Sequence, residues 1–183
     1  MTWTKLPLVL LSILLTSARA QSPVAPPAQI ILIRHAEKPA DRDNPHLSPA
    51  GVTRAQSLVS FMMKNPAMSG LGPPVAVFAT KTTKHDNGQR TQETVAPLAK
   101  ALKLPVQTPF LSKDYAALAN LILANPAYSG KTVLICWTHE DIPDLTAALG
   151  VKGRQPKWKG SVYDRVYVIS YRDRKPTLTT LSY

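Results

Sequence analysis

The sequence has a single cysteine, Cys136, and few acidic residues: 11 Asp and Glu stand against 22 Lys and Arg. A lone cysteine cannot form a disulfide within the chain, so a disulfide-stabilised scaffold is excluded. The shortage of acidic residues leaves a formal net charge of +11. A charge of this sign favours anionic partners, whether phosphate esters, nucleic acid or an anionic membrane surface.

Metal sites and nucleic-acid sites lack their usual sequence patterns here. The 4 histidines follow no familiar metal-ligand spacing, so we expect no metal and no cofactor. Aromatic and basic residues do not alternate along the predicted strands, and no known nucleic-acid-binding module is present. Nucleic acid is therefore not expected as a partner.

A long membrane-spanning run is also missing. The apolar stretch from Leu6 to Leu15 is well short of the roughly 20 residues that span a bilayer. Lys5 precedes it, and Ala18-Arg19-Ala20 offers small residues at the positions that a signal peptidase reads. Residues 1–20 are therefore predicted to be a cleaved signal peptide, which predicts an exported protein, periplasmic or secreted, with no stable membrane anchor after cleavage. A single uncleaved anchor is the alternative.

The remainder is predicted to be a proline-rich linker at residues 21–28 and one domain at residues 29–183. Apolar runs typical of buried strands alternate with apolar residues at helical spacing. This order predicts an α/β fold, a three-layer α/β/α sandwich with a mostly parallel central sheet and an antiparallel edge. The strands are expected at 29–34, 74–79, 131–137, 163–170 and 177–181, and the helices at 48–63, from about Arg90 to Leu102, from a cap at Ser112 to Ile122, and at 144–149.

Two of the predicted strands run directly into a histidine. The first ends in Arg34-His35, and another, about a hundred residues later, ends near His139-Glu140. Open α/β sheets bind ligands outside the carboxyl ends of their strands, so we expect both histidines at the same edge of the sheet.

The residues around these strand ends suit a phosphoryl group. Arg34 and Arg90 each carry a planar fork of donors that can bind two phosphate oxygens, and Arg90 lies near the start of a helix, whose dipole favours an anion. A neutral imidazole at His35 can attack phosphorus and form a phosphohistidine that water then hydrolyses. His139, when protonated, can stabilise the negative charge that develops on the oxygens.

Four motifs also resemble a known family. Arg34-His35-Ala36-Glu37, Leu47-Ser48-Pro49-Ala50-Gly51, Arg90-Thr91-Gln92-Glu93-Thr94 and the late His139 are similar, in order and approximate spacing, to the histidine phosphatase superfamily, also called phosphoglycerate mutase-like. The resemblance covers about Gln29 to Tyr171. It implies that His35 accepts the phosphoryl group, that Arg34, Arg90 and His139 complete the pocket, and that the fold is phosphoglycerate mutase-like.

The chain departs from the family pattern at two places. Ala36 stands where many members have glycine, a change that is tolerated if the backbone there does not need a positive φ. The polar stretch from Lys81 to Gln89 replaces a compact turn beside the pocket. The short interval between Arg90 and His139 leaves no room for a cap insertion, so we expect an open pocket.

The proton donor for the leaving group is left open by the sequence. Glu140 is the first candidate, because an acidic residue follows the late histidine in the acid phosphatase branch of the family. Asp114 is the alternative donor, and Asp141 and Glu37 are weaker candidates; each can equally be a helix-end or surface carboxylate. Without a placed acid, the chemistry would favour good leaving groups, as in phosphoanhydrides, acyl phosphates and protein phosphohistidine.

Together these features predict an exported, metal-independent phosphatase that hydrolyses phosphate monoesters or anhydrides through a phosphohistidine at His35. Its substrate is expected to be a phosphorylated small molecule, a glycan or a phosphopeptide, and Lys38 is a further substrate contact because it lies near His35 in sequence. The alternative is a non-catalytic envelope protein that binds phosphate or another anion.

Overall fold

The computed structural model describes residue 1 and residues 24–41, 43–65, 70–84, 88–153 and 155–183. Apart from Met1, the predicted signal peptide lies outside the described residues, as does His85 in the predicted polar loop. No helix within these ranges is long and apolar enough to cross a membrane. The elements in chain order are β1 (Gln29–Arg34), α1 (Pro49–Lys64), β2 (Ala76–Ala79), α3 (Gln89–Leu102), β3 (Val106–Gln107), the 3-10 helix η1 (Ser112–Asp114), α4 (Tyr115–Ala124), the 3-10 helix η2 (Pro126–Tyr128), β4 (Thr132–Trp137), α5 (Ile142–Ala148), β5 (Arg165–Arg172) and β6 (Lys175–Ser182).

The strands form a 6-stranded sheet in the order β3-β2-β4-β1-β5-β6. Strands β1 to β4 pair in parallel, whereas β5 is antiparallel to β1 and β6 is antiparallel to β5. The predicted mixed sheet with an antiparallel edge is confirmed. No sequence pattern indicates β3, because a strand of 2 residues is too short for a period-2 pattern.

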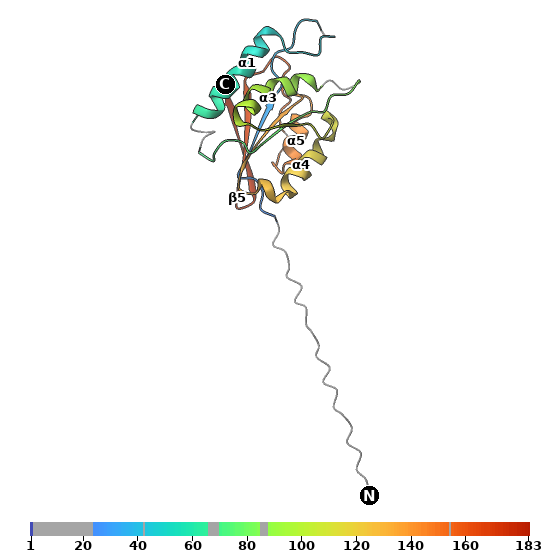
Figure 1. The fold of residues 1–183 in the computed structure, drawn as a ribbon, viewed down its shortest axis with the longest axis vertical. Coiled ribbons are helices and arrows are strands. Elements are labelled where there is room, and N and C mark those ends of the chain that lie inside the picture. The colour runs from blue at the N-terminus through green and yellow to red at the C-terminus, as the bar shows by residue number, and fades with distance from the viewer. Residues whose placement is uncertain (2–23, 42, 66–69, 85–87, 154) are drawn as a thin grey trace.

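Helices cover both faces of the sheet (Figure 1), which confirms the three-layer sandwich. Successive residues of β1 point to opposite faces: Ile30 and Leu32 pack with residues of α4 and α5, whereas Ile31 and Ile33 pack with residues of α1 and α3. Burial on both faces explains why β1 reads as a continuous apolar run rather than an alternating one.

Two boundaries near the site differ from the expected ones. Ser112 does not cap a long helix but opens η1, and α4 begins only at Tyr115. Strand β5 begins at Arg165, so Tyr163 lies in the loop before the strand rather than in it. The predicted linker is attached to the domain at its end, where Gly130 N donates to Pro26 O at 3.0 Å and Ala28 N to Lys131 O at 2.9 Å.

Candidate active site

The two histidines lie at the same edge of the sheet, as the strand-end rule predicts. Strands β1 and β4 are parallel neighbours with Arg34 opposite Trp137. The backbone N–H of His35 continues this pairing by donating to Trp137 O at 3.3 Å. The ring centroids of His35 and His139 are 6.3 Å apart, a separation that leaves space for a small group between them.

The hydrogen bond at Nδ1 fixes the tautomer of His35. Nδ1 lies 2.7 Å from Ala36 O, and a carbonyl oxygen can only accept, so Nδ1 carries the hydrogen and Nε2 keeps its lone pair. The pKa of His35 is lowered from its ordinary value of 6.5 to about 4, chiefly by burial; the hydrogen bond to Ala36 O opposes this shift, and the electrostatic effects of Arg34, Arg90 and His139 contribute to it. The ring is therefore neutral at pH 7, with Nε2 available as a nucleophile.

The turn after His35 is held by α1 and α3. Ala36 N donates to Thr94 Oγ1 at 2.8 Å, and Ser48 N donates to Glu37 O at 2.9 Å. A Cβ on Gly51 would lie only 2.4 Å from Glu37 O, so this position needs glycine for close backbone contact. Ala36 is not among the residues with positive φ, which explains how alanine can stand here in place of the family's glycine.

Arg34 is 1% exposed and divides its donors between a loop and the site. Nη1 donates to Gly160 O at 2.9 Å, to Val162 O at 3.1 Å and to Lys159 O at 3.4 Å. Nη2 faces Nε2 of His35 at 3.4 Å, and Nε is buried with no hydrogen-bond partner among the described residues. Nε and Nη2 lie along one edge of the guanidinium, the fork that binds two oxygens of a phosphate.

Arg90 lies in the first turn of α3 and contacts the segment before α1. Nη2 donates to Asn44 O at 2.7 Å and Nε to His46 O at 3.3 Å. Glu93, one helical turn further along, accepts from Nδ1 of His46 at 2.5 Å and from Leu47 N at 2.9 Å. Arg90 is thus oriented by two carbonyls, and its charge is close enough to His35 to lower that pKa.

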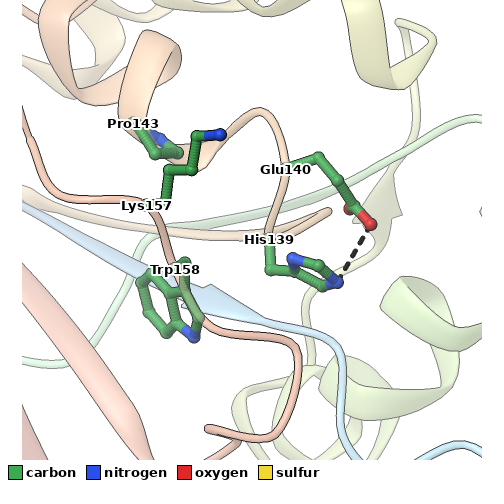
Figure 2. A pocket seen from close by; sticks show the side chains of 5 residues that line it. All are labelled: His139, Glu140, Pro143, Lys157 and Trp158. Carbon is green, nitrogen blue, oxygen red and sulfur yellow. Dashed lines mark ion pairs between the residues drawn. The ribbon is translucent and has the colours of Figure 1, made fainter.

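His139 and Glu140 lie at the end of β4 (Figure 2), beside a cavity of about 310 Å³ that is also lined by Pro143, Lys157 and Trp158. Nε2 of His139 lies 2.9 Å from Oε1 of Glu140. This hydrogen bond, against the opposing effect of burial, lowers the pKa of Glu140 to about 2. The carboxylate is therefore ionised at neutral pH, and in this geometry it holds no proton for a leaving group.

The other candidate acids are engaged in local structure. Asp114 is exposed and accepts from Leu111 N at 3.3 Å, as a cap of η1. Asp141 is 4% exposed; its Oδ1 lies 2.6 Å from Lys113 Nζ, and its Oδ2 accepts from Thr138 Oγ1 at 3.0 Å. Among the described residues, no interaction joins Asp114 or the exposed Lys38 to His35 or His139.

Glu37 is the fourth carboxylate considered, and it is paired with Arg54. Nε and Nη2 of Arg54 both lie 2.7 Å from Oε1 of Glu37. Burial acts to raise the pKa of Glu37, but the hydrogen bonds and charge of Arg54 outweigh it, and the net pKa is lowered. Glu37 is therefore also ionised at neutral pH.

Two residues at the site were not found by sequence reasoning. Tyr163 places its ring 3.9 Å from Cζ of Arg34 and 6.1 Å, edge to face, from the ring of His35. Thr94 links α3 to the turn after His35. The motif that begins at Arg90 includes Thr94 and could have pointed to it, whereas Tyr163 falls in no motif. Among the described residues, no group of three His, Cys, Asp or Glu could hold a metal ion.

Comparison with known proteins gives matches only among solved structures: no protein-family model and no curated protein matches the chain. The mycobacterial glucosyl-3-phosphoglycerate phosphatase in complex with inorganic phosphate matches with a TM-score of 0.55 at 14% identity, over 85% of this chain and 96% of that one. The α-ribazole phosphatase from Shigella flexneri matches with a TM-score of 0.51 at 17% identity, over 85% and 96%.

A third match is a SixA protein from Agrobacterium tumefaciens, to which phosphohistidine phosphatase activity is attributed. It has a TM-score of 0.51 at 16% identity and covers 86% of this chain and 99% of its own. At such identities the likeness establishes architecture, and all three structures are members of one superfamily. The chain has the fold of the histidine phosphatase superfamily, as the resemblance of its motifs implied.

Proposed function

We propose that the protein is a metal-independent phosphatase that hydrolyses phosphate monoesters or anhydrides through a phosphohistidine at His35. The observation that carries this proposal is the state of His35: its Nδ1 hydrogen is directed to Ala36 O at 2.7 Å, its pKa is lowered to about 4, and its Nε2 faces Arg34. A histidine in this state has its lone pair available at neutral pH and pointed toward a cation that can hold the phosphate.

The reaction has two steps. In the first, the Nε2 lone pair of His35 forms a bond to phosphorus while the bond to the leaving-group oxygen breaks, and that oxygen departs with the electron pair. The phosphorylated ring keeps its Nδ1 hydrogen and carries a positive charge. In the second step, a water oxygen attacks phosphorus, the N–P electron pair returns to Nε2, and the water proton passes to solvent or to the phosphate.

The remaining site residues act on the transferred group. The Nε and Nη2 fork of Arg34, whose Nε is buried with no hydrogen-bond partner in the part of the chain that the structure describes, binds two of its oxygens, and Nε thereby gains an acceptor. Arg90 and His139 add positive charge and donors around the developing trigonal bipyramid. Glu140 holds the Nε2 hydrogen of His139, and its role in this proposal is to orient that imidazole rather than to donate a proton.

The ionisation and hydrogen bonding of the carboxylates limit which leaving groups the site can expel. Glu140 and Glu37 have lowered pKa values, and Asp114 and Asp141 are hydrogen-bonded within the fold. A site in which no carboxyl is placed to give a proton to the leaving group expels poor leaving groups slowly. We therefore rank phosphoanhydrides, acyl phosphates and phosphohistidine above simple alkyl phosphates as substrates.

Export and the broader substrate class belong to the same proposal. The sequence at residues 1–20 supports export, and the mycobacterial and Shigella structures are phosphatases of small phosphorylated molecules. For this chain we propose only that the substrate is phosphorylated, whether it is a small molecule, a glycan or a phosphopeptide. We also propose that Lys38, which is exposed, contacts the part of the substrate beyond the phosphate.

The test is hydrolysis by residues 21–183 in the presence of EDTA, with a series of aryl phosphates whose leaving groups differ in pKa, together with acetyl phosphate and an alkyl phosphate. We expect metal-independent turnover with a rate that falls steeply as the leaving-group pKa rises. A rate that does not change with the leaving-group pKa would show that an acid does protonate the leaving group. Binding of inorganic phosphate without turnover of any substrate would favour the anion-binding alternative.

A further inference from the structure

The guanidinium of Arg34 is held in place by one short loop. The three carbonyls that accept from Nη1 belong to Lys159, Gly160 and Val162, more than a hundred residues along the chain. Val162 O also accepts from Nε1 of Trp158 at 2.8 Å, and Trp158 is 3% exposed. The loop is thus tied to the core at a buried indole and presents its carbonyls to Arg34.

These hydrogen bonds all end on Nη1, and the contact of Nη2 with Nε2 of His35 is long, at 3.4 Å. The guanidinium is therefore held mainly at one corner, and a small tilt of its far edge needs only slight bending of these bonds. The ring of Tyr163 lies against the guanidinium, 3.9 Å from Cζ to the ring centroid, and the same ring meets the imidazole of His35 edge to face. A ring in this position restricts the tilt of Arg34 and contacts the nucleophile at once.

We propose that Tyr163 is a positioning residue that fixes the plane of the Arg34 guanidinium, and with it the direction of the Nε and Nη2 fork, relative to Nε2 of His35. The inference rests on the proposed function, because its consequence is the placement of phosphate for attack. The aromatic face provides this restraint, and the hydroxyl is not required.

The ring of Tyr163 and the carbonyls that bind Arg34 belong to the same loop. Tyr163 directly follows Val162, whose carbonyl binds Arg34, and Asp164 O accepts from the backbone N–H of Tyr183 at 3.0 Å. Because both sides of Tyr163 are anchored, loss of its ring leaves the loop in place and removes one restraint on Arg34. A substitution should therefore act on phosphate binding more than on folding.

The experiment compares Tyr163→Leu and Tyr163→Phe with the wild-type residues 21–183. Loss of a cation–π contact predicts about a tenfold fall in kcat/KM and about a tenfold weaker binding of inorganic phosphate for Tyr163→Leu. Tyr163→Phe keeps the ring and is expected to stay within about twofold of wild type for both quantities. Phosphate binding is measured by calorimetry, so this readout does not depend on turnover.

Tyr128→Leu is the matched control. Tyr128 is also half-buried and makes an edge-to-face contact with Phe78, with ring centroids 5.9 Å apart, near the opposite end of β4. It is expected to lower Tm while leaving kcat/KM and phosphate affinity unchanged. An equal loss of phosphate affinity in Tyr128→Leu would overturn the inference, because the effect would then be general destabilisation.

Two further outcomes overturn the positioning role: wild-type phosphate affinity in Tyr163→Leu, or the same loss in Tyr163→Phe as in Tyr163→Leu, which would assign the effect to the hydroxyl. If wild type binds phosphate but turns over no substrate, the proposed function fails while the affinity comparison still decides the inference. If wild type binds no phosphate, both are overturned.

Discussion

The ends of β1 and β4 each deliver a histidine to the same edge of the sheet, but the two are built differently. His35 is 8% exposed and lies in a turn held by α1 and α3. The side chain of His139 is 19% exposed and is paired with Glu140, whose side chain is 61% exposed. The surroundings of His35 are therefore closely packed and nearly closed to water, whereas His139 borders a cavity beside exposed side chains.

His35→Ala is the substitution with the largest expected effect on this comparison. Without the nucleophile no phosphoenzyme can form, so we expect kcat to fall by at least about a thousandfold. His139→Ala, which removes charge stabilisation only, should lose about a hundredfold. Steady-state kinetics with an aryl phosphate measure both, and equal losses would mean that the two strand ends are not specialised.

Gly51→Ala tests whether the β1 end is rigid. Its Cβ would meet Glu37 O at 2.4 Å, a backbone atom that cannot move without the turn after His35. We expect about 1–3 kcal/mol lower stability from overpacking, with a loss of activity. Urea unfolding measures the change in stability. Gly160→Ala is the control for stability, because its Cβ meets His139 only at an ordinary 3.7 Å; unchanged stability of Gly51→Ala would refute the rigid turn.

Glu140→Gln separates orientation from proton donation at the β4 end. If Glu140 only holds His139, the amide still accepts a hydrogen bond, and kcat/KM should fall about three- to tenfold for every substrate. If Glu140 is the general acid, the loss should reach about a hundredfold or more for poor leaving groups and vanish for good ones. A kcat/KM series over leaving groups distinguishes the two roles.

The pH dependence of stability should show two adjoining windows, one for each strand end. The pKa of His35 falls from 6.5 to about 4 on folding, so the unfolded chain binds this proton first and stability declines as pH falls from about 6.5 to about 4. Glu140, lowered from 4.5 to about 2, is ionised when folded, and its contribution is lost only as pH falls from about 4.5 to about 2. Urea unfolding of wild type and His35→Asn at pH 7, 5.5 and 4 measures the first window. An identical pH dependence in the two proteins would contradict the low pKa of His35.

Much of the fold and part of the site follow from local sequence patterns. Apolar runs identify β1 and β4, and parallel pairing of neighbouring strands brings His35 and His139 together. The capping of α1 by Ser48 could also be predicted, because a cap and a following proline are local signals. These predictions depend on residues that lie next to each other in the chain.

The rest depends on the path of a loop that has no periodic pattern. The contact of Arg34 with Gly160 joins residues separated by 126 positions, and nothing in the spacing of glycine and lysine residues indicates it. The low pKa of Glu140 depends mainly on its hydrogen bond with His139, and sequence cannot tell whether that carboxylate faces a substrate or its neighbouring histidine. The apolar pattern predicts Tyr163 within a strand, whereas the residue lies in the loop before β5 with its ring against Arg34.

The most direct test of the central claim is to trap the phosphoenzyme. Residues 21–183 are mixed with acetyl phosphate, quenched in base, and digested for mass spectrometry under conditions that preserve phosphohistidine. We expect an acid-labile, base-stable phosphate on His35, present in wild type and absent from His35→Ala. Rapid turnover with no phosphate on His35, or with phosphate on another residue, would contradict it.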